Sequence, residues 1–231
     1  MPQSRLAAGI VAINGEAVDG LEEEYRAHFT LRRRVYVDQT GQLAESDLHL
    51  DGTDRDDDDA RSVTFAVFEN HKKGVRVVGV SRLILRGESQ LPIEQFCPDS
   101  FDQIPLGPKA VEVSRVISRH ESAPLQELVQ WHLFALMLAH IANQGLGRTF
   151  AIIEPWLERH LRSVIAIERI GAMRYSERYL DYNVPIEIDI PASTAAVNRR
   201  DESLIARYRA AEPAMAHFGH LPQSGKTERV A

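Results

Sequence analysis

The sequence predicts an α/β or α+β fold built on a twisted β-sheet of mixed strand direction. Residues 62–69 and 75–85 are rich in β-branched and apolar residues and flank a polar turn, a pattern typical of a β-hairpin. Further on, an apolar strand at residues 110–118 is followed by a helical segment and by a short apolar run at residues 149–154. Hairpins followed by strand–helix–strand units indicate a sheet with both antiparallel and parallel pairs.

The first helix is predicted over residues 21–37, where apolar side chains recur at helical spacing. One face of it is formed by Tyr25, Phe29, Arg32 and Tyr36. Arg32 is therefore a cation within an apolar stripe. The acidic segment at residues 41–60 is expected to be a loop. In the second hairpin strand, Arg82 shares a face with Val80 and Ile84, so it is a second cation on an apolar surface.

The later elements are predicted from start and stop signals. Residues 90–109 hold four prolines and are expected to be irregular, and a helix runs from residue 122 to 145. A second helix is predicted from residue 155 to about 167, and the last strand at residues 186–190. We expect one domain over residues 1–191 and a partly helical or disordered extension over residues 192–231.

Composition excludes several classes of protein. With 231 residues, 44% hydrophobic and 26% charged, the chain has the make-up of an ordinary soluble domain. No apolar run approaches the roughly 18 residues that span a bilayer, so we expect a cytoplasmic protein without a membrane span. A formal net charge of −6 argues against nucleic-acid binding. The single Cys97 excludes a metal site made of several cysteines. The aspartate run from Asp54 lacks the glycine and the glutamate of an EF-hand, so no metal site is expected.

The strand at residues 110–118 carries two charges, Glu112 and Arg115, in an otherwise apolar sequence. Buried charges cost several kcal/mol each unless they are paired, so this strand holds either a structural ion pair or part of an active site. Three arginines occupy positions where the pattern expects apolar residues, and three carboxylates could meet them. These residues are Arg32, Arg82 and Arg115, with Asp56, Asp59 and Glu112. Their number favours a functional site over a plain ion-pair network.

Regular strand geometry would point Glu112 and Ser114 to one face and Arg115 to the other. A β-bulge would turn Glu112 and Arg115 toward one site, and bulges commonly lie beside active sites. The sequence therefore predicts an irregular backbone between these residues.

The order of these residues resembles a known family. The motifs are Leu31-Arg32-x-x-x-Tyr36, Asp56-x-x-Asp59, Ser81-Arg82-Leu83, Phe96 and Glu112-x-x-Arg115. Together they are similar to those of the acyl-homoserine-lactone synthases, the autoinducer synthases of bacterial quorum sensing, and of the related N-acyl amino acid synthases. Both groups are members of the GNAT acyltransferase superfamily, and the resemblance covers roughly residues 25–190.

The resemblance implies a sheet that splays beside the strand of Glu112, with the donor thioester in the splay next to Val113 and Ser114. Free backbone N–H groups there would polarise the thioester carbonyl. Glu112 matches the proposed general base, which acts through water, and Arg115 lies beside it. The other residues that it places at the substrates are Arg32, Tyr36, Asp56, Asp59, Arg82, Phe96 and Ala151, with Phe96 on the path of the acyl chain.

The chain departs from the autoinducer synthases at three positions. Those enzymes carry a tryptophan near Gln42 and Leu43, a phenylalanine at the position of Tyr36, and in some members a threonine at the position of Ala151. The first two changes concern the acceptor, and the third favours an acyl chain that is not oxidised. The acceptor therefore stays open between S-adenosylmethionine, which would give a lactone, and a free amino acid.

The donor is expected to be an acyl-phosphopantetheine thioester, with no tightly bound cofactor. Residues 119–124 contain no glycine with which to cradle a pyrophosphate, and Glu121 would repel one, so an acyl carrier protein suits the loop better than coenzyme A. Its acidic surface could dock on Arg119, Arg148, Arg159 and Arg162. The alternatives are a small-acyl transferase that uses coenzyme A and a non-catalytic module that binds an acyl ligand.

Overall fold

The computed structural model describes residues 6–71, 74–102 and 106–209. Its centre is a nine-stranded sheet in the order β2-β1-β3-β4-β5-β6-β9-β7, with β8 paired to β9. β5 and β6 run parallel and the other pairs are antiparallel, which confirms the predicted mixed sheet. The strands are β1 Leu6–Ile13, β2 Glu16–Ala17, β3 Ser62–His71, β4 Gly74–Leu85, β5 Val111–Ser118, β6 Thr149–Ile153, β7 Ile167–Arg169, β8 Arg174–Ser176 and β9 Asp181–Ile188.

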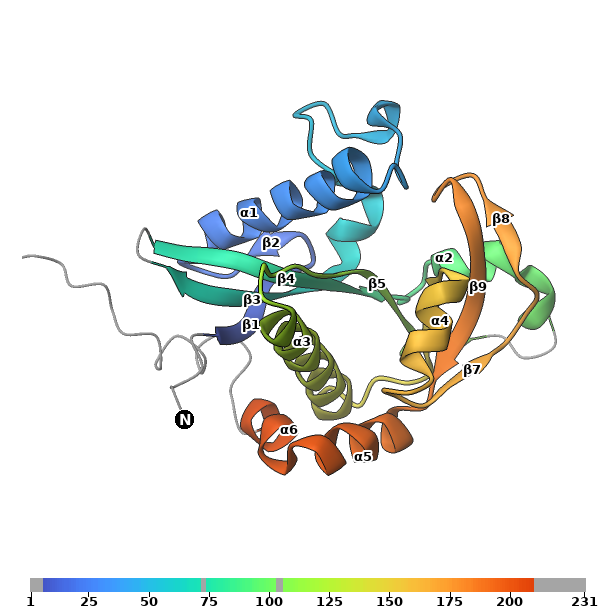
Figure 1. Ribbon diagram of the computed structural model, residues 1–231. Coiled ribbons are helices and arrows are strands. Elements are labelled where there is room, and N and C mark those ends of the chain that lie inside the picture. The colour runs from blue at the N-terminus through green and yellow to red at the C-terminus, as the bar shows by residue number, and fades with distance from the viewer. Residues whose placement is uncertain (1–5, 72–73, 103–105, 210–231) are drawn as a thin grey trace, which may run out of the picture.

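Helices cover both faces of the sheet (Figure 1). α1 lies on one face, and α3 lies on the other with α5 and α6 beyond it (Figure 1). The helices are α1 Glu22–Arg33, which continues as a π-helix over Arg34–Gln39, α2 Pro92–Phe96, α3 Ala123–Asn143, α4 Pro155–Leu161, α5 Ile190–Arg200 and α6 Glu202–Arg209. No helix in the described ranges is both long and apolar enough to cross a bilayer.

The largest hydrophobic cluster surrounds α3. This helix is apolar on nearly every side because it packs between the sheet and the pair α5–α6. Val197 and Tyr208 of those two helices are buried in the same cluster, so residues beyond 191 contribute to this core. A second cluster joins α1 to the opposite face, and a third joins α2 to Ile84 and Phe150. The division of the chain at residue 191 stays a prediction.

Several predicted elements differ from the structure. The helix from Pro155 ends at Leu161 instead of continuing to residue 167, because the chain turns there and Ile167 pairs with Ile188 as part of β7. The irregular stretch at residues 90–109 contains α2. The last strand ends at Ile188, so that Asp189 can cap α5 by accepting the Ala192 N–H at 2.9 Å. The strand β1 was not predicted.

Gly79 in β4 allows α3 to approach the sheet closely. A Cβ atom at this position would lie 2.4 Å from Val129 Cγ1 and 3.3 Å from the Ile117 carbonyl oxygen. We expect Gly79→Ala to lower the free energy of unfolding by about 1–3 kcal/mol, because the added methyl group overpacks the core. Urea denaturation would measure this, with Gly107→Ala as a control because no atom lies within 4 Å of its added Cβ. Equal midpoints for both variants would contradict the prediction.

Candidate active site

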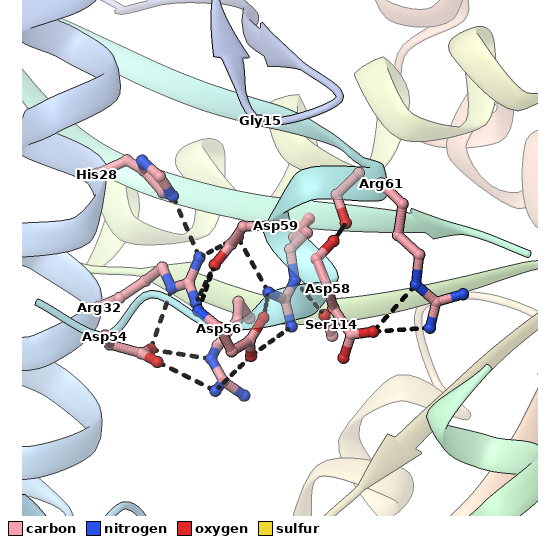
Figure 2. Close-up of polar contacts among 12 residues, drawn as sticks. Gly15, His28, Arg32, Asp54, Asp56, Asp58, Asp59, Arg61 and Ser114 are labelled. Atoms are coloured by element: carbon pink, nitrogen blue, oxygen red, sulfur yellow. Dashed lines mark hydrogen bonds and ion pairs between the residues drawn. The ribbon is translucent and has the colours of Figure 1, made fainter. Parts of the chain in front are cut away.

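Three arginines and three aspartates form a compact charged cluster at the end of α1, between the helix and the sheet (Figure 2). The members of the charged cluster are Arg32 of α1, Arg82 of β4, Arg115 of β5, and Asp54, Asp56 and Asp59 of the connection that precedes β3. The structure therefore brings together the three predicted arginines and two of the three predicted carboxylates. Equal numbers of cations and anions allow this group to be buried.

Asp54 joins two of the arginines. It accepts hydrogen bonds from Arg32 Nε at 3.0 Å and from Arg115 Nε at 2.9 Å, both on Oδ2. Arg115 Nη2 adds a bond to Oδ1 at 3.1 Å. Burial acts to raise the pKa of Asp54, but the two guanidinium groups outweigh it and hold this pKa below its ordinary value. Asp54 is thus ionised and links α1 to β5.

Asp56 and Asp59 hold Arg82 in the same way. Arg82 donates from Nη1 and Nη2 to the two oxygens of Asp56, and its Nη1 lies 3.0 Å from Asp59 Oδ1. Asp59 also accepts from Arg32 Nη1 at 2.7 Å and from the Asp56 N–H at 3.0 Å, which closes the 3-10 turn Asp57–Arg61. Despite burial, the neighbouring arginines hold the pKa of both aspartates below its usual range.

His28 lies one helical turn before Arg32 and fixes its orientation. Its Nδ1 is 2.5 Å from the Tyr25 carbonyl oxygen, so this nitrogen donates, and its Nε2 can accept from Arg32 Nη1 at 3.3 Å. Burial, with help from the Arg32 charge, lowers the pKa of His28 to about 3. His28 is therefore neutral and positions Arg32.

The predicted irregular backbone in β5 is found just beyond Ser114, but it does not bring Glu112 and Arg115 to one site: Glu112 accepts from Ile93 of α2, whereas Arg115 joins the charged cluster. Val80 pairs with Ile117 and Arg82 pairs with Ser114, so one residue of β4 faces two of β5. At the bulge Arg115 has a φ of 53°, in the left-handed region that non-glycine residues seldom adopt. Its guanidinium reaches the charged cluster and stacks over the Tyr36 ring at 5.2 Å from the centroid. Ser114 Oγ accepts from Arg82 Nε at 3.0 Å on the same face of the sheet.

Glu112 is completely buried beside α2. It takes no part in the ion pairs of the charged cluster. Its Oε2 accepts the Ile93 N–H at 2.7 Å, whereas Oε1 has no hydrogen-bond partner among the described residues. Burial raises the pKa of Glu112 to about 8 and outweighs the Ile93 bond and the Arg178 charge, which lower it. A carboxyl group with one unsatisfied oxygen and a pKa near neutrality has the properties of a general base.

A cavity of about 980 Å³ opens where β5 and β6 separate. The strands pair from Val111 to Val113 and diverge beyond the Val113–Ala151 pair. The cavity lies in this splay, with apolar walls from α3, α4 and β9. The predicted site residues that line it are Tyr36, Val113, Ser114, Arg115 and Ala151. Neither Glu112 nor Phe96 is among the lining residues, and Phe96 packs against the cluster of Ile84 and Phe150.

Sequence reasoning did not single out Asp54, Arg178 and Tyr179. The sequence signal for Asp54 is its place at the start of the aspartate run, two residues before the predicted site residue Asp56. Arg178 lies in the β8–β9 connection and donates at 3.0 Å to Asp56 Oδ2 and at 3.0 Å to Asp58 Oδ2. The guanidinium groups of Arg115 and Arg178 lie 5.8 and 5.7 Å from the centroid of the Tyr179 ring. Nothing in the pattern of residues 174–183 indicates these contacts.

Comparison with known proteins identifies similar sequences and folds. Residues 31–122 match the family model of the acetyltransferase (GNAT) domain. No curated protein matches the chain in sequence. Among solved structures, FeeM, an N-acyl amino acid synthase from uncultured soil microbes, has a TM-score of 0.60 at 18% identity, and the match covers 83% of this chain and 94% of FeeM.

Two further structures have the same fold. BjaI, a CoA-dependent acyl-homoserine lactone synthase, has a TM-score of 0.64 at 21% identity over 88% of this chain and 100% of its own. The acyl-homoserine lactone synthase LasI has a TM-score of 0.62 at 13% identity, over 83% of this chain and 93% of its own. Residues 31–122 therefore match an acetyltransferase (GNAT) domain, and the chain has the fold of these three synthase structures. The predicted resemblance is confirmed in the fold.

Proposed function

We propose that the protein is an N-acyltransferase of the autoinducer-synthase type. It moves a fatty-acyl group from a phosphopantetheine thioester to the amine of an amino-acid-derived acceptor. The observation that carries this proposal is the cavity in the β5–β6 splay, which is mainly apolar and has the bulged, charged residues of β5 at its edge. An acyl chain fits apolar walls, and a polar acceptor fits the edge.

In the proposed reaction the amine nitrogen attacks the thioester carbonyl, so that a C–N bond forms and the C–S bond breaks. β5 beyond Val113 has no β6 partner, so its backbone N–H groups on that side can stabilise the oxyanion. Glu112 takes the proton of the amine through water, as its raised pKa allows. The charged cluster holds Arg115 and Ser114 in place at the acceptor side. Phe96 supports this region from the opposite face.

The loop before α3 supports a carrier-protein donor. A pyrophosphate would need free N–H groups there, but the Arg119 N–H bonds to the Val78 carbonyl at 2.9 Å. The Ser122 N–H donates to His120 Nδ1 at 2.9 Å, and Pro124 has no N–H to offer. The loop is thus largely occupied by its own contacts, which disfavours coenzyme A. BjaI, described as CoA-dependent, keeps coenzyme A as the second candidate.

Exposed arginines, of which Arg119 lines the cavity, support the docking of an acidic carrier protein. Arg119 and Arg159 are exposed, whereas Arg148 is paired with Glu187 at 2.6 Å. Arg162 is paired with Glu158 at 2.8 Å. Docking therefore rests mainly on Arg119 and Arg159. We place the reaction in the cytoplasm, where acyl carrier proteins supply such donors.

Mass spectrometry of lipid extracts tests the proposal. Cells that express the chain are expected to contain a new N-acyl product, either an acyl-homoserine lactone from S-adenosylmethionine or an N-acyl amino acid, that is absent from cells without it. A short acyl amide would favour the small-acyl alternative. Extracts with no new amide, from cells in which the protein is folded and abundant, would contradict the proposal and favour a module that only binds acyl ligands.

A further inference from the structure

Glu154 projects a carboxylate into the cavity from the end of β6, immediately before α4. It lines the cavity together with Tyr36, Arg115 and Tyr179. A residue at the N-terminal boundary of a helix usually caps it, but the Glu154 side chain makes no capping hydrogen bond to α4. Its carboxylate is therefore available for another role.

Gln42 holds this carboxylate across the cavity mouth. Gln42 Nε2 donates to Glu154 Oε1, and Thr40 Oγ1 donates to Gln42 Oε1 at 2.9 Å. The contact joins the loop after α1 to the start of α4, although the two residues are far apart in sequence. Gln42 also lies near the position at which the resemblance places a tryptophan in the autoinducer synthases, so this polar contact accompanies a difference from those enzymes.

No arginine, lysine or histidine forms an ion pair with Glu154 in the described part of the chain. Arg115, the nearby cation of the cavity edge, is already occupied by Asp54 and Asp56. Glu154 is also close enough to affect Tyr36: burial raises the pKa of that phenol, Arg115 opposes this, and the Glu154 charge adds to it. A carboxylate without a counter-ion in a partly enclosed cavity favours a cationic ligand.

We propose that Glu154, positioned by Gln42, binds the positively charged group of the acceptor. This inference rests on the proposed function. An amine acceptor enters the site as an ammonium ion, and S-adenosylmethionine carries a sulfonium ion as well. Glu154 holds the acceptor, and Glu112 remains the base. The two carboxylates therefore separate binding from proton transfer, and their substitutions affect different kinetic constants.

The test measures thiol release and amide formation with decanoyl-CoA and with decanoyl carrier protein as donors. The acceptors are S-adenosylmethionine, S-adenosylhomocysteine and each of the free amino acids. For the acceptor used by the wild type, Glu154→Gln is expected to raise KM by about 10- to 100-fold, because a charged hydrogen bond is lost, and to leave kcat within about threefold. Gln42→Met should raise KM by a smaller factor, also without a change in kcat. Glu168→Gln, on exposed β7, is the matched control and should change neither constant.

The outcomes distinguish the two proposals. An active wild type with an unchanged KM in Glu154→Gln would overturn the role of Glu154 and leave the proposed function intact. A loss of kcat at unchanged KM would also overturn it, since this would make Glu154 part of the chemistry. A wild type that acylates no acceptor would overturn both. Use of S-adenosylmethionine but not S-adenosylhomocysteine identifies the sulfonium as the bound cation, whereas use of a free amino acid identifies the ammonium.

Discussion

Replacement of Glu112 with glutamine is expected to lower kcat for acyl transfer by about 10²- to 10⁴-fold, the usual contribution of a general base. Glutamine keeps the shape of the side chain and can still accept the Ile93 N–H through its amide oxygen. It cannot take a proton from the acceptor amine. Steady-state assays with the wild-type acceptor measure this loss, and KM for the acceptor should change little because Glu112 does not line the cavity.

The pH dependence supplies the second part of this test. Glu112 acts as a base only when it is ionised, and its pKa is raised to about 8. Turnover of the wild type should therefore rise as the pH increases from 6, reach half its maximum near pH 8 and level off roughly one pH unit higher. The residual activity of Glu112→Gln should lack this rise. A variant with the wild-type rate and the wild-type pH profile would exclude Glu112 as the base.

Stability measurements separate this loss of activity from misfolding. The pKa of Glu112 is higher in the folded protein than its ordinary value of 4.5, so the folded state favours the protonated form. The stability that this group contributes is complete below pH 4.5 and is lost as the pH rises through about 8. Glutamine cannot ionise, so Glu112→Gln should become more stable relative to the wild type as the pH rises from 4.5 to about 8.

Much of the site could be predicted because buried charge is rare in a periodic apolar pattern. Arg32 and Arg82 each interrupt an apolar face, and each is buried in the charged cluster. An irregular backbone in β5 could be predicted from the charge of Arg115, but the expectation that it would bring Glu112 and Arg115 to one site was wrong, because Glu112 contacts α2 and Arg115 joins the charged cluster. The burial of the arginines and the irregular backbone of β5 both follow from the local pattern of apolar and charged residues, which can be read from the sequence.

The other contacts depend on how distant segments meet. Glu154 and Gln42 approach each other because the loop after α1 and the end of β6 border the same cavity. Arg178 reaches Asp56 from the β8–β9 connection, although the two residues are 122 positions apart in the sequence. Polar residues in exposed segments follow no periodic pattern. The sequence therefore does not distinguish Gln42, Glu154 and Arg178 from neighbouring residues that only face solvent. The end of α4 also depends on a distant segment, because Ile167 pairs with Ile188 of β9.

Removal of the Asp54 charge is expected to cause the largest loss of stability. Asp54→Asn should lower the free energy of unfolding by about 3–5 kcal/mol at pH 7, because Arg32 and Arg115 lose the carboxylate that they share and an uncompensated charge stays buried. Asp57→Asn is the matched control from the same aspartate run, since Asp57 is exposed. Urea denaturation at pH 7 measures both variants, and a loss in Asp54→Asn no larger than that of the control would contradict the prediction.

The dependence of this loss on pH follows from the lowered pKa of Asp54. The stability that its charge contributes is present above the unfolded pKa of about 3.8 and is lost as the pH falls through the lower folded value. The difference in stability between the wild type and Asp54→Asn should therefore shrink in acid below pH 4.

Arg115→Met combined with Asp54→Asn should lower the free energy of unfolding by less than the two single changes added together, because the double variant removes a cation along with its partner. Such coupling would show that Asp54 holds the bulged Arg115 at the cavity edge by charge, which packing alone would not produce.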